Sequence, residues 1–325
     1  MRRLTYADTN ELRGQYGQTV LLFLTDRCPV GCAHCSVDSR ADSPMVTDYE
    51  LFEELVMGIT AAPLPLVGIS GGEPFVERRA LPLAVDRFRG AGKDVVVYTS
   101  GYWASGRRVQ PWIADVLRKT STVFLSTDSF HQGRVSMERF RRAAGHIADA
   151  GCHIVSQVLD EPRSLAFVRT VFGEMFGAGW ERHADLVPTK PLPHGRGKDV
   201  FQITKRHVLA AFGPCMAASA PTIRYDGLVI GCCNEAMIMG AGPEQLRRRV
   251  RSRADLEAAL ESFRTAPLLR TIATVPLAEV GRLPGFTPLD DQRYESICQA
   301  CWRAHDLMAA DPRAAAVIAG VGARA

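Results

Sequence analysis

No stretch of this 325-residue sequence approaches the roughly 20 consecutive apolar residues that a membrane-spanning helix needs. Arg2 and Arg3 are followed by polar residues, where an export signal would be apolar. The formal net charge is only +4, which is too small to indicate a nucleic-acid or membrane-surface partner. These absences predict a cytoplasmic protein whose partners are neither nucleic acid nor membrane.

The sequence also lacks internal repeats and low-complexity tracts, and its composition favours a folded core. Hydrophobic residues make up 46% of the chain and charged residues 23%, so disorder is not expected. A length of 325 residues allows two domains, or one large α/β domain with a small appendage. Nine cysteines are many for a cytosolic chain, and in a reducing compartment clustered cysteines indicate metal binding or catalysis before disulfides.

Short apolar runs alternate with amphipathic segments through the first part of the chain. The expected strands cover 19–25, 66–70, 94–100, 122–127, 152–158 and, more weakly, 185–189. The expected helices cover 47–62, 76–92, 109–119, 136–151 and 164–179. This alternation predicts an α/β fold, a partial (β/α)6 TIM-like barrel built on a parallel sheet. Functional groups in such a barrel lie on the loops that follow the strands.

A Pro- and Gly-rich segment at 187–199 marks the expected end of the barrel. We predict an N-terminal extension at 1–17, the barrel at 18–198, and a small α+β domain with a C-terminal helix at 199–325. In the last part, residues 222–233 indicate a hairpin that turns at Asp226-Gly227, and helices are expected near 243–264 and 296–310. The basic run RRRVRSR at 247–253 is expected to be a solvated helix face rather than a site for an acidic partner.

Three cysteines lie within eight residues directly after the first expected strand: Cys28, Cys32 and Cys35. The small residues Gly31 and Ala33 between them let the backbone wrap a bulky inorganic group. Three thiolates on a [4Fe–4S] cluster leave one iron without a protein ligand, open to a substrate or cofactor. A zinc knuckle with its fourth ligand elsewhere, such as His34, is the structural alternative.

The C-x3-C-x2-C spacing of this loop resembles the signature of the radical S-adenosylmethionine (SAM) superfamily. Gly71-Gly72-Glu73-Pro74, after the second expected strand, is similar to the GGE motif of that family. The resemblance covers about residues 18–190, and it implies that S-adenosyl-L-methionine chelates the open iron of the [4Fe–4S] cluster. Reduction by a flavodoxin- or ferredoxin-type partner would then release a 5′-deoxyadenosyl radical that abstracts a hydrogen atom.

The same resemblance implies further contacts with SAM. Gly71 and Gly72 let the backbone approach the methionine part of SAM, and the carboxylate of Glu73 can receive its ammonium group. His34 stands where the family packs an aromatic residue against adenine. The other positions that resemble the family's SAM-binding residues are Ser100, Ser126, Asp128 and Gln157.

A second set of cysteines lies in the last third of the sequence. Cys215 and Cys232, in a C-x11-G-x4-C pattern, resemble the opening of a SPASM or twitch domain, an auxiliary-cluster module of many radical SAM enzymes. Cys298 and Cys301 would complete four thiolates for one auxiliary [4Fe–4S] cluster. A structural zinc site with four cysteine ligands is the alternative. A cluster held by four cysteines has no open iron, so it favours electron transfer over substrate binding.

Together these features predict a radical SAM enzyme that abstracts hydrogen from a C–H bond of a natural-product intermediate. The main expectation is net oxidation of an aminocyclitol or sugar, because dehydrogenases of aminoglycoside biosynthesis have this compact build. The alternatives are epimerisation with Cys233 as hydrogen donor, and cross-linking or epimerisation of a ribosomally made short peptide. Cys233 could equally be a small buried hydrophobic residue. A zinc-bearing binding protein is the non-enzymatic alternative.

Overall fold

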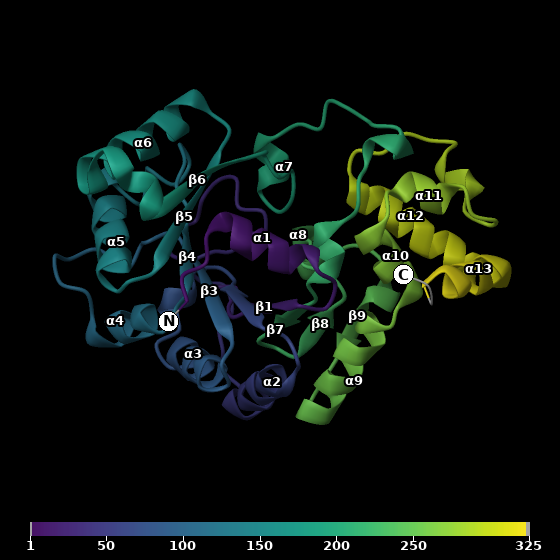
Figure 1. Ribbon diagram of the computed structural model, residues 1–325, viewed down its shortest axis with the longest axis horizontal. Helices are drawn as coiled ribbons and strands as arrows, with labels where there is room; N and C mark the ends of the chain where they lie inside the picture. Colours follow the sequence, from purple (N-terminus) through teal and green to yellow (C-terminus); the bar gives the residue numbers. More distant parts are fainter. Residues whose placement is uncertain (1, 323–325) are drawn as a thin grey trace.

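The computed structural model describes residues 2–322, which contain one mixed sheet of nine strands (Figure 1). The strand order is β6-β5-β4-β3-β2-β1-β7-β8-β9; β1 to β7 run parallel, and β8 and β9 are antiparallel additions. The strands are β1 (Thr19–Phe23), β2 (Leu66–Ser70), β3 (Asp94–Thr99), β4 (Thr122–Leu125), β5 (His153–Leu159), β6 (Ala184–Thr189), β7 (Thr222–Arg224), β8 (Leu228–Ile230) and β9 (Arg247–Arg249).

The connecting helices cover one face of the parallel strands (Figure 1). They are α2 (Tyr49–Ala61), α3 (Ala80–Gly90), α4 (Pro111–Arg118), α5 (Met137–Asp149) and α6 (Pro162–Phe176). Side-chain caps define where two of them begin, since the side chain of Asp48 accepts the N–H of Leu51 and that of Ser136 accepts the N–H of Arg139. All five helices and the first six strands lie where the sequence predicts them, so the partial barrel is confirmed.

The predicted N-terminal extension contains helix α1 (Tyr6–Gly14). Thr5 and Asp8 form a reciprocal capping box at its start. Leu4, just before it, is fully buried against side chains from four different strands: Leu66, Val96, Phe124 and Val155. Because side chains alternate between the two faces of a strand, these residues lie on the opposite face to the one that α2–α6 cover. Helix α1 therefore covers the inner face of the half-barrel.

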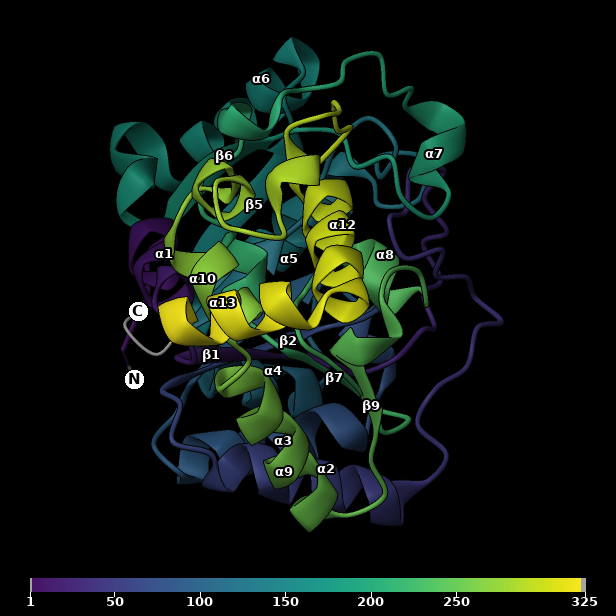
Figure 2. The ribbon, with the colours of Figure 1, turned by 90° about the vertical axis from the view of Figure 1, so that its right-hand side faces the viewer.

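The remaining helices follow β6 in the chain. They are the helices α7 (Gly197–Val200), α8 (Glu235–Ile238), α9 (Arg253–Arg264), α10 (Pro267–Thr274), α11 (Leu277–Gly281), α12 (Ile297–Ala310) and α13 (Pro312–Gly322). Most of them gather at the β7–β9 end of the sheet (Figure 1), and Figure 2 shows α10, α12 and α13 in front of the sheet. Short 3-10 helices occur at Pro74–Val76, Gly177–Arg182, Leu209–Ala211, Met216–Ser219, Glu244–Leu246 and Thr287–Leu289. The predicted hairpin is confirmed, with Gly227 at a φ of +82° in its turn. Within residues 2–322 no helix combines the length and apolar character that crossing a membrane requires.

The predicted helix at 243–264 is wrong in its first part. Glu244–Leu246 form a 3-10 turn, Arg247–Arg249 form the edge strand β9, and α9 begins only at Arg253. Ser252 sets this start, because its hydroxyl accepts the N–H of Asp255. The run RRRVRSR is therefore not a helix face. Pairing of β9 with β8 overrides the helical propensity of arginine, which is a weak local preference.

Candidate active site

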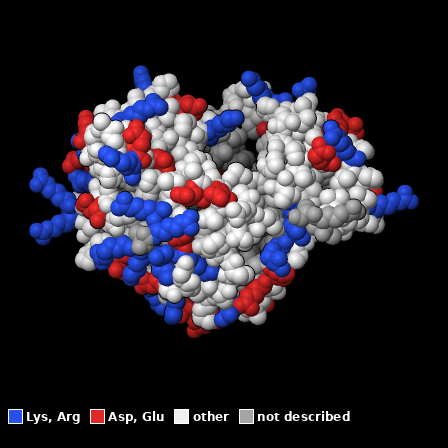
Figure 3. Space-filling view, in the orientation of Figure 1, with Lys and Arg blue, Asp and Glu red and all other residues white. Residues whose placement is uncertain are grey.

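A cavity of ≈ 620 Å³ opens at the carboxyl ends of the parallel strands. Figure 3 shows the surface hollowed between the barrel and the C-terminal helices. The loops after β1, β2, β3 and β4, together with strand β5, bring most of the predicted cluster and SAM residues to its wall. These lining residues are Cys28, Cys32, His34, Cys35, Gly71, Gly72, Ser100, Ser126, Asp128 and Gln157.

The three-cysteine loop presents its thiols to this cavity. Cys28 and Cys32 are each 9% exposed, and Gly31 between them has a φ of +62°, in the left-handed region that glycine tolerates. Burial raises the pKa of the Cys28 thiol to about 12, so a metal that binds there must displace a proton. Three cysteines converging on one cavity wall fit a [4Fe–4S] cluster with one open iron.

A smaller grouping of metal-binding atoms overlaps the loop. Single ligand atoms of Cys32, His34 and His131 lie within 4.8 Å of one another. Nε2 of His34 lies 3.0 Å from the carboxylate of Asp128, and its ring stacks on Phe130 with 4.7 Å between centroids. A zinc ion held by this grouping would use one of the three loop cysteines and leave the other two without a role. The grouping accounts for the loop less well than a cluster does.

Asp128, predicted near the SAM ribose, forms an ion pair with His131. Its carboxylate lies 2.9 Å from Nδ1 of His131 and accepts the backbone N–H groups of Phe130 and His131. Burial opposes ionisation of Asp128, but the hydrogen bonds and charges of His131 and His34 outweigh it and hold the pKa below its usual range. Burial also opposes the charge on His131, yet Asp128 and Cys32 raise its pKa to about 10. A positive imidazolium therefore stands beside the cysteine loop.

The GGE segment lies against the start of the cysteine loop. A side chain at Gly72 would place its Cβ 2.3 Å from the carbonyl oxygen of Arg27, so only glycine fits there. Glu73 does not line the cavity. Its carboxylate accepts hydrogen bonds from the hydroxyl of Thr99 and from both the hydroxyl and the N–H of Ser100. The contact of Glu73 with SAM stays a prediction, and in this geometry the carboxylate acts by fixing Ser100, which does face the cavity.

Arg196, outside the predicted site, clamps the cysteine loop. Its guanidinium donates two hydrogen bonds to the carbonyl of Cys32, at 2.7 and 3.0 Å, and one to Asp38 at 2.6 Å. Its neighbour Gly195 has a φ of +54°, and a Cβ there would lie 2.5 Å from the carbonyl oxygen of Cys35. In the sequence the signal is the Gly195-Arg196 pair of the Pro- and Gly-rich segment, which is weak by itself.

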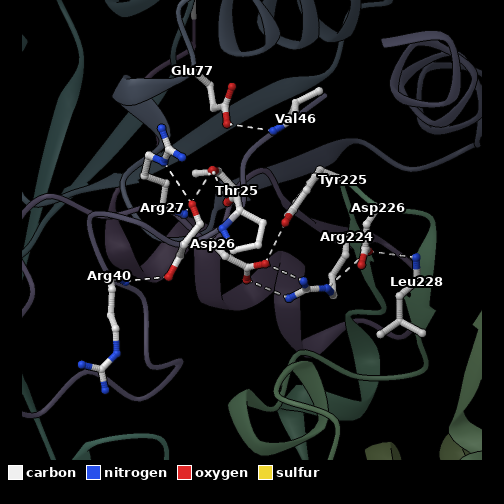
Figure 4. A network of polar contacts seen from close by, with 12 residues as sticks. Thr25, Asp26, Arg27, Arg40, Val46, Glu77, Arg224, Tyr225, Asp226 and Leu228 are labelled. Atoms are coloured by element: carbon white, nitrogen blue, oxygen red, sulfur yellow. Dashed lines mark hydrogen bonds and ion pairs between the residues drawn. The ribbon is translucent and has the colours of Figure 1, made fainter. Parts of the chain in front are cut away.

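A polar network connects the cysteine loop to the β7–β8 hairpin (Figure 4). Arg224 donates to both oxygens of Asp26, at 3.1 and 2.7 Å, and the hydroxyl of Tyr225 donates to the same carboxylate at 2.8 Å. The Arg224 side chain is only 11% exposed. A largely buried charge depends on its partner, so this network couples the base of the loop to the C-terminal part.

Cys233 also lines the cavity, with Arg13 and Glu235 beside it. A guanidinium nitrogen of Arg13 lies 4.0 Å from Sγ of Cys233. Burial raises the pKa of Cys233 and also that of Glu235. Lys190, after β6, is exposed and lines the same cavity. Sequence analysis missed Arg13, Glu235 and Lys190, because no local pattern shows that α1 and α8 reach the barrel mouth.

The four cysteines of the second set come from three separated segments and are free thiols: Cys215, Cys232, Cys298 and Cys301. Burial is the largest cause of the raised pKa of Cys301, and the charges of the other three thiols add to it. The four cysteines therefore share one region of the fold. His305 is 3% exposed, neither of its ring nitrogens has a partner in the described part of the chain, and helical spacing places it on the Cys301 face of α12. A neutral imidazole can donate its N–H to inorganic sulfide or bind zinc through its other nitrogen, so the ring fits either metal group.

No protein-family model matches the sequence. Solved structures that share the fold include two with S-adenosylmethionine bound, which agrees with the fold that the resemblance implies. SuiB of Streptococcus suis, solved with bound S-adenosylmethionine, is 14% identical; the superposition covers 87% of this chain and 77% of SuiB, with a TM-score of 0.50. The protein anSMEcpe, solved with bound AdoMet, is 14% identical with 92% and 98% coverage and a TM-score of 0.51.

Two further comparisons involve peptides. SuiB has also been solved bound to its precursor peptide SuiA, at 12% identity to this chain, 87% and 76% coverage and a TM-score of 0.50. YydG of Bacillus subtilis (strain 168), provisionally assigned to peptide biosynthesis, is 24% identical over 134 residues. That match covers 40% of this chain and 42% of YydG. The likeness to solved structures at these identities establishes the shared fold.

Proposed function

We propose that the protein is a radical SAM enzyme that epimerises a residue of a peptide substrate. The observation that carries this proposal is that Cys233 and the three loop cysteines line the same cavity. A [4Fe–4S] cluster with bound SAM supplies the adenosyl radical that removes a hydrogen atom from a substrate carbon. Cys28, Cys32 and Cys35 would hold that cluster, and Arg196 would keep their loop in place.

Cys233 suits the return of a hydrogen atom to the opposite face of the substrate. Hydrogen-atom donation needs an S–H group rather than a thiolate, and burial raises the pKa of Cys233 so that its proton is retained at neutral pH. In this step the S–H bond breaks, a C–H bond forms and an unpaired electron stays on the sulfur. One electron, from a flavodoxin- or ferredoxin-type reductant, and one proton then restore the thiol.

A peptide accounts for the cavity and the comparisons better than an aminocyclitol does. The wall near Cys233 offers a carboxylate on Glu235 that can accept amide N–H groups, and a guanidinium on Arg13 that can donate to a carbonyl. YydG and the SuiB–SuiA complex, both connected with peptides, support the same substrate class. Net oxidation of an aminocyclitol stays a prediction.

The second cysteine set would hold an auxiliary cluster. Cys215, Cys232, Cys298 and Cys301 supply four thiols, which is a complete ligand set without an open position. Such a site suits electron transfer, and Cys233 directly follows one of its ligands in the chain. It would therefore be suited to return the electron that Cys233 loses.

The test is anaerobic turnover in deuterated water with SAM, dithionite and short synthetic peptides encoded beside the gene. Epimerisation predicts deuterium at one Cα and a D-residue in the product, both lost in Cys233→Ala. Cys152→Ala is the matched control, since Cys152 is buried, donates to the carbonyl of Leu117 and does not line the cavity. A product two hydrogens poorer and free of deuterium would instead support oxidation. Absence of 5′-deoxyadenosine under reducing conditions would remove the radical SAM assignment itself.

A further inference from the structure

Asn234 connects the two sites through both ends of its side-chain amide. It is 7% exposed and is the N-cap residue of α8. Its Oδ1 accepts the backbone N–H of Met237 at 3.1 Å, and its Nδ2 lies 3.2 Å from Sγ of Cys298. Because the N–H of Met237 can only donate, the amide oxygen must face it. The NH₂ group is therefore the end that meets the sulfur.

Successive residues of this segment face different sites. Cys232 belongs to the second cysteine set, the next residue, Cys233, lines the large cavity, and Asn234 again faces the second set. Three consecutive residues thus form the wall between the two sites. The amide of Asn234 is rigid there, since its helix cap and its burial both oppose rotation.

A hydrogen bond from N–H to a ligand sulfur withdraws electron density from that sulfur. It stabilises the more negative, reduced state of an iron–sulfur cluster, and such bonds are among the protein features that set a cluster's reduction potential. In a buried site the effect is strong because little solvent competes with it. Cys298 accepts this bond from a neutral donor, so no change in ligand count or net charge accompanies it.

We propose that Asn234 is a positioning residue that raises the reduction potential of the auxiliary cluster by donating a hydrogen bond to Cys298. The inference rests on the auxiliary cluster of the proposed function. It assigns to Asn234 a role distinct from helix capping, and the two roles can be separated. Asn234→Ser retains a neutral cap acceptor but is too short to reach the sulfur. Asn234→Asp retains the cap and replaces the donor by a second oxygen.

The measurement is a redox titration followed by electron paramagnetic resonance. The protein of 325 residues carries Cys28→Ala, Cys32→Ala and Cys35→Ala, so that the auxiliary cluster alone is observed. We expect the midpoint potential to become more negative with Asn234→Ser, and further with Asn234→Asp, which adds a negative charge. Ser252→Ala, which removes the cap of α9, is the control and should leave the potential unchanged. An unshifted potential in a folded, iron-loaded Asn234→Ser protein would overturn the inference.

Isotope labelling tests the contact without altering Asn234. The sequence contains two asparagines, Asn10 and Asn234. Protein labelled with side-chain ¹⁵N-asparagine should show a nitrogen hyperfine coupling to the reduced cluster, retained in Asn10→Gln and absent in Asn234→Ser. A labelled protein with the cluster but without the coupling contradicts the inference. If the protein binds zinc instead of iron, the auxiliary cluster itself is wrong. This outcome can be distinguished from an iron-loaded protein in which only the role of Asn234 is wrong.

Discussion

Cys28, Cys32 and Cys35 stand on one loop directly after β1, whereas Cys215, Cys232, Cys298 and Cys301 come from three separated segments. The first site lines a cavity of ≈ 620 Å³ and has three thiols; the second has four, of which Cys232 and Cys301 are buried and Cys215 and Cys298 are half-buried. A contiguous loop can leave one side of its metal group open, while ligands collected from several elements surround it. Under the proposed function, the first site would bind a reactant and the second would exchange electrons.

The largest effect is expected from Cys28→Ala. Loss of one of three ligands should remove the first cluster, so that iron falls from about eight to about four per chain. Formation of 5′-deoxyadenosine should fall by about a thousandfold or more, equivalent to a barrier about 4 kcal/mol higher. Iron analysis and chromatography of SAM cleavage products check this. Unchanged SAM cleavage would show that the loop is not the reactive site.

Cys298→Ala should affect the second site alone. Iron should fall by about half, since four thiols hold the second of two [4Fe–4S] clusters, while the initial rate of SAM cleavage is retained. Peptide turnover should stop after about one cycle, because Cys233 cannot be reduced again without an electron source. Rapid-quench product analysis would show the single turnover. If multiple turnovers persist in this variant, the electron-transfer role of the second site is wrong.

Asp26→Ala tests the connection between the two regions. It removes the carboxylate that accepts two hydrogen bonds from the largely buried guanidinium of Arg224, which keeps only a longer contact of 3.4 Å with Asp226. We expect the free energy of unfolding to fall by about 3 kcal/mol. Urea denaturation of the cluster-free protein measures this. Glu279→Ala, which breaks a surface pair with Arg282, is the control and should cost less than about 1 kcal/mol. Equal effects of the two variants would argue against coupling through the hairpin.

The smallest effect is expected in the pH dependence of stability, through His305 near the second cysteine set. Burial lowers the pKa of His305 to about 4, so the folded state holds the ring neutral while the unfolded state protonates it near pH 6.5. The stabilisation from this group is present above pH 6.5 and is lost as the pH falls towards 4, by up to about 3 kcal/mol. His305→Leu should flatten that part of the stability profile of the cluster-free protein. An unchanged profile would mean that the ring is solvated.

The sequence best predicts those elements whose formation depends on residues within a single segment. The alternation of apolar runs and amphipathic helices predicts β1 to β6 and α2 to α6, because period and length are properties of each segment by itself. The spacing of Cys28, Cys32 and Cys35 predicts a shared site for the same reason. The elements that the sequence analysis does not predict depend on tertiary contacts. β9 exists because β8 pairs with it, and α1 is held against the sheet by the burial of Leu4.

In the candidate site, too, local sequence predicts some features and tertiary contacts determine the others. Gly72 is predicted from its motif, and the structure explains it by a carbonyl 2.3 Å from where a Cβ would lie. Arg13 in α1, Arg196 just before α7 and Glu235 in α8 are absent from the predicted site because these elements lie outside the strand loops that carry the motifs. Glu73 lies in the predicted segment but is turned inward to Thr99 and Ser100. Motifs therefore locate the loops of the site better than the direction of their side chains.

Strand β1 hydrogen-bonds to β2 on one side and to β7 on the other. Trimming the chain before β7 would leave the inner strand of the barrel with a bare row of N–H and C=O groups, a template for intermolecular pairing. The barrel is therefore not a module that can be excised at the boundary expected near 198. A soluble fragment, or a chimaera with a foreign C-terminal half, must bring its own strand to complete the β1 edge.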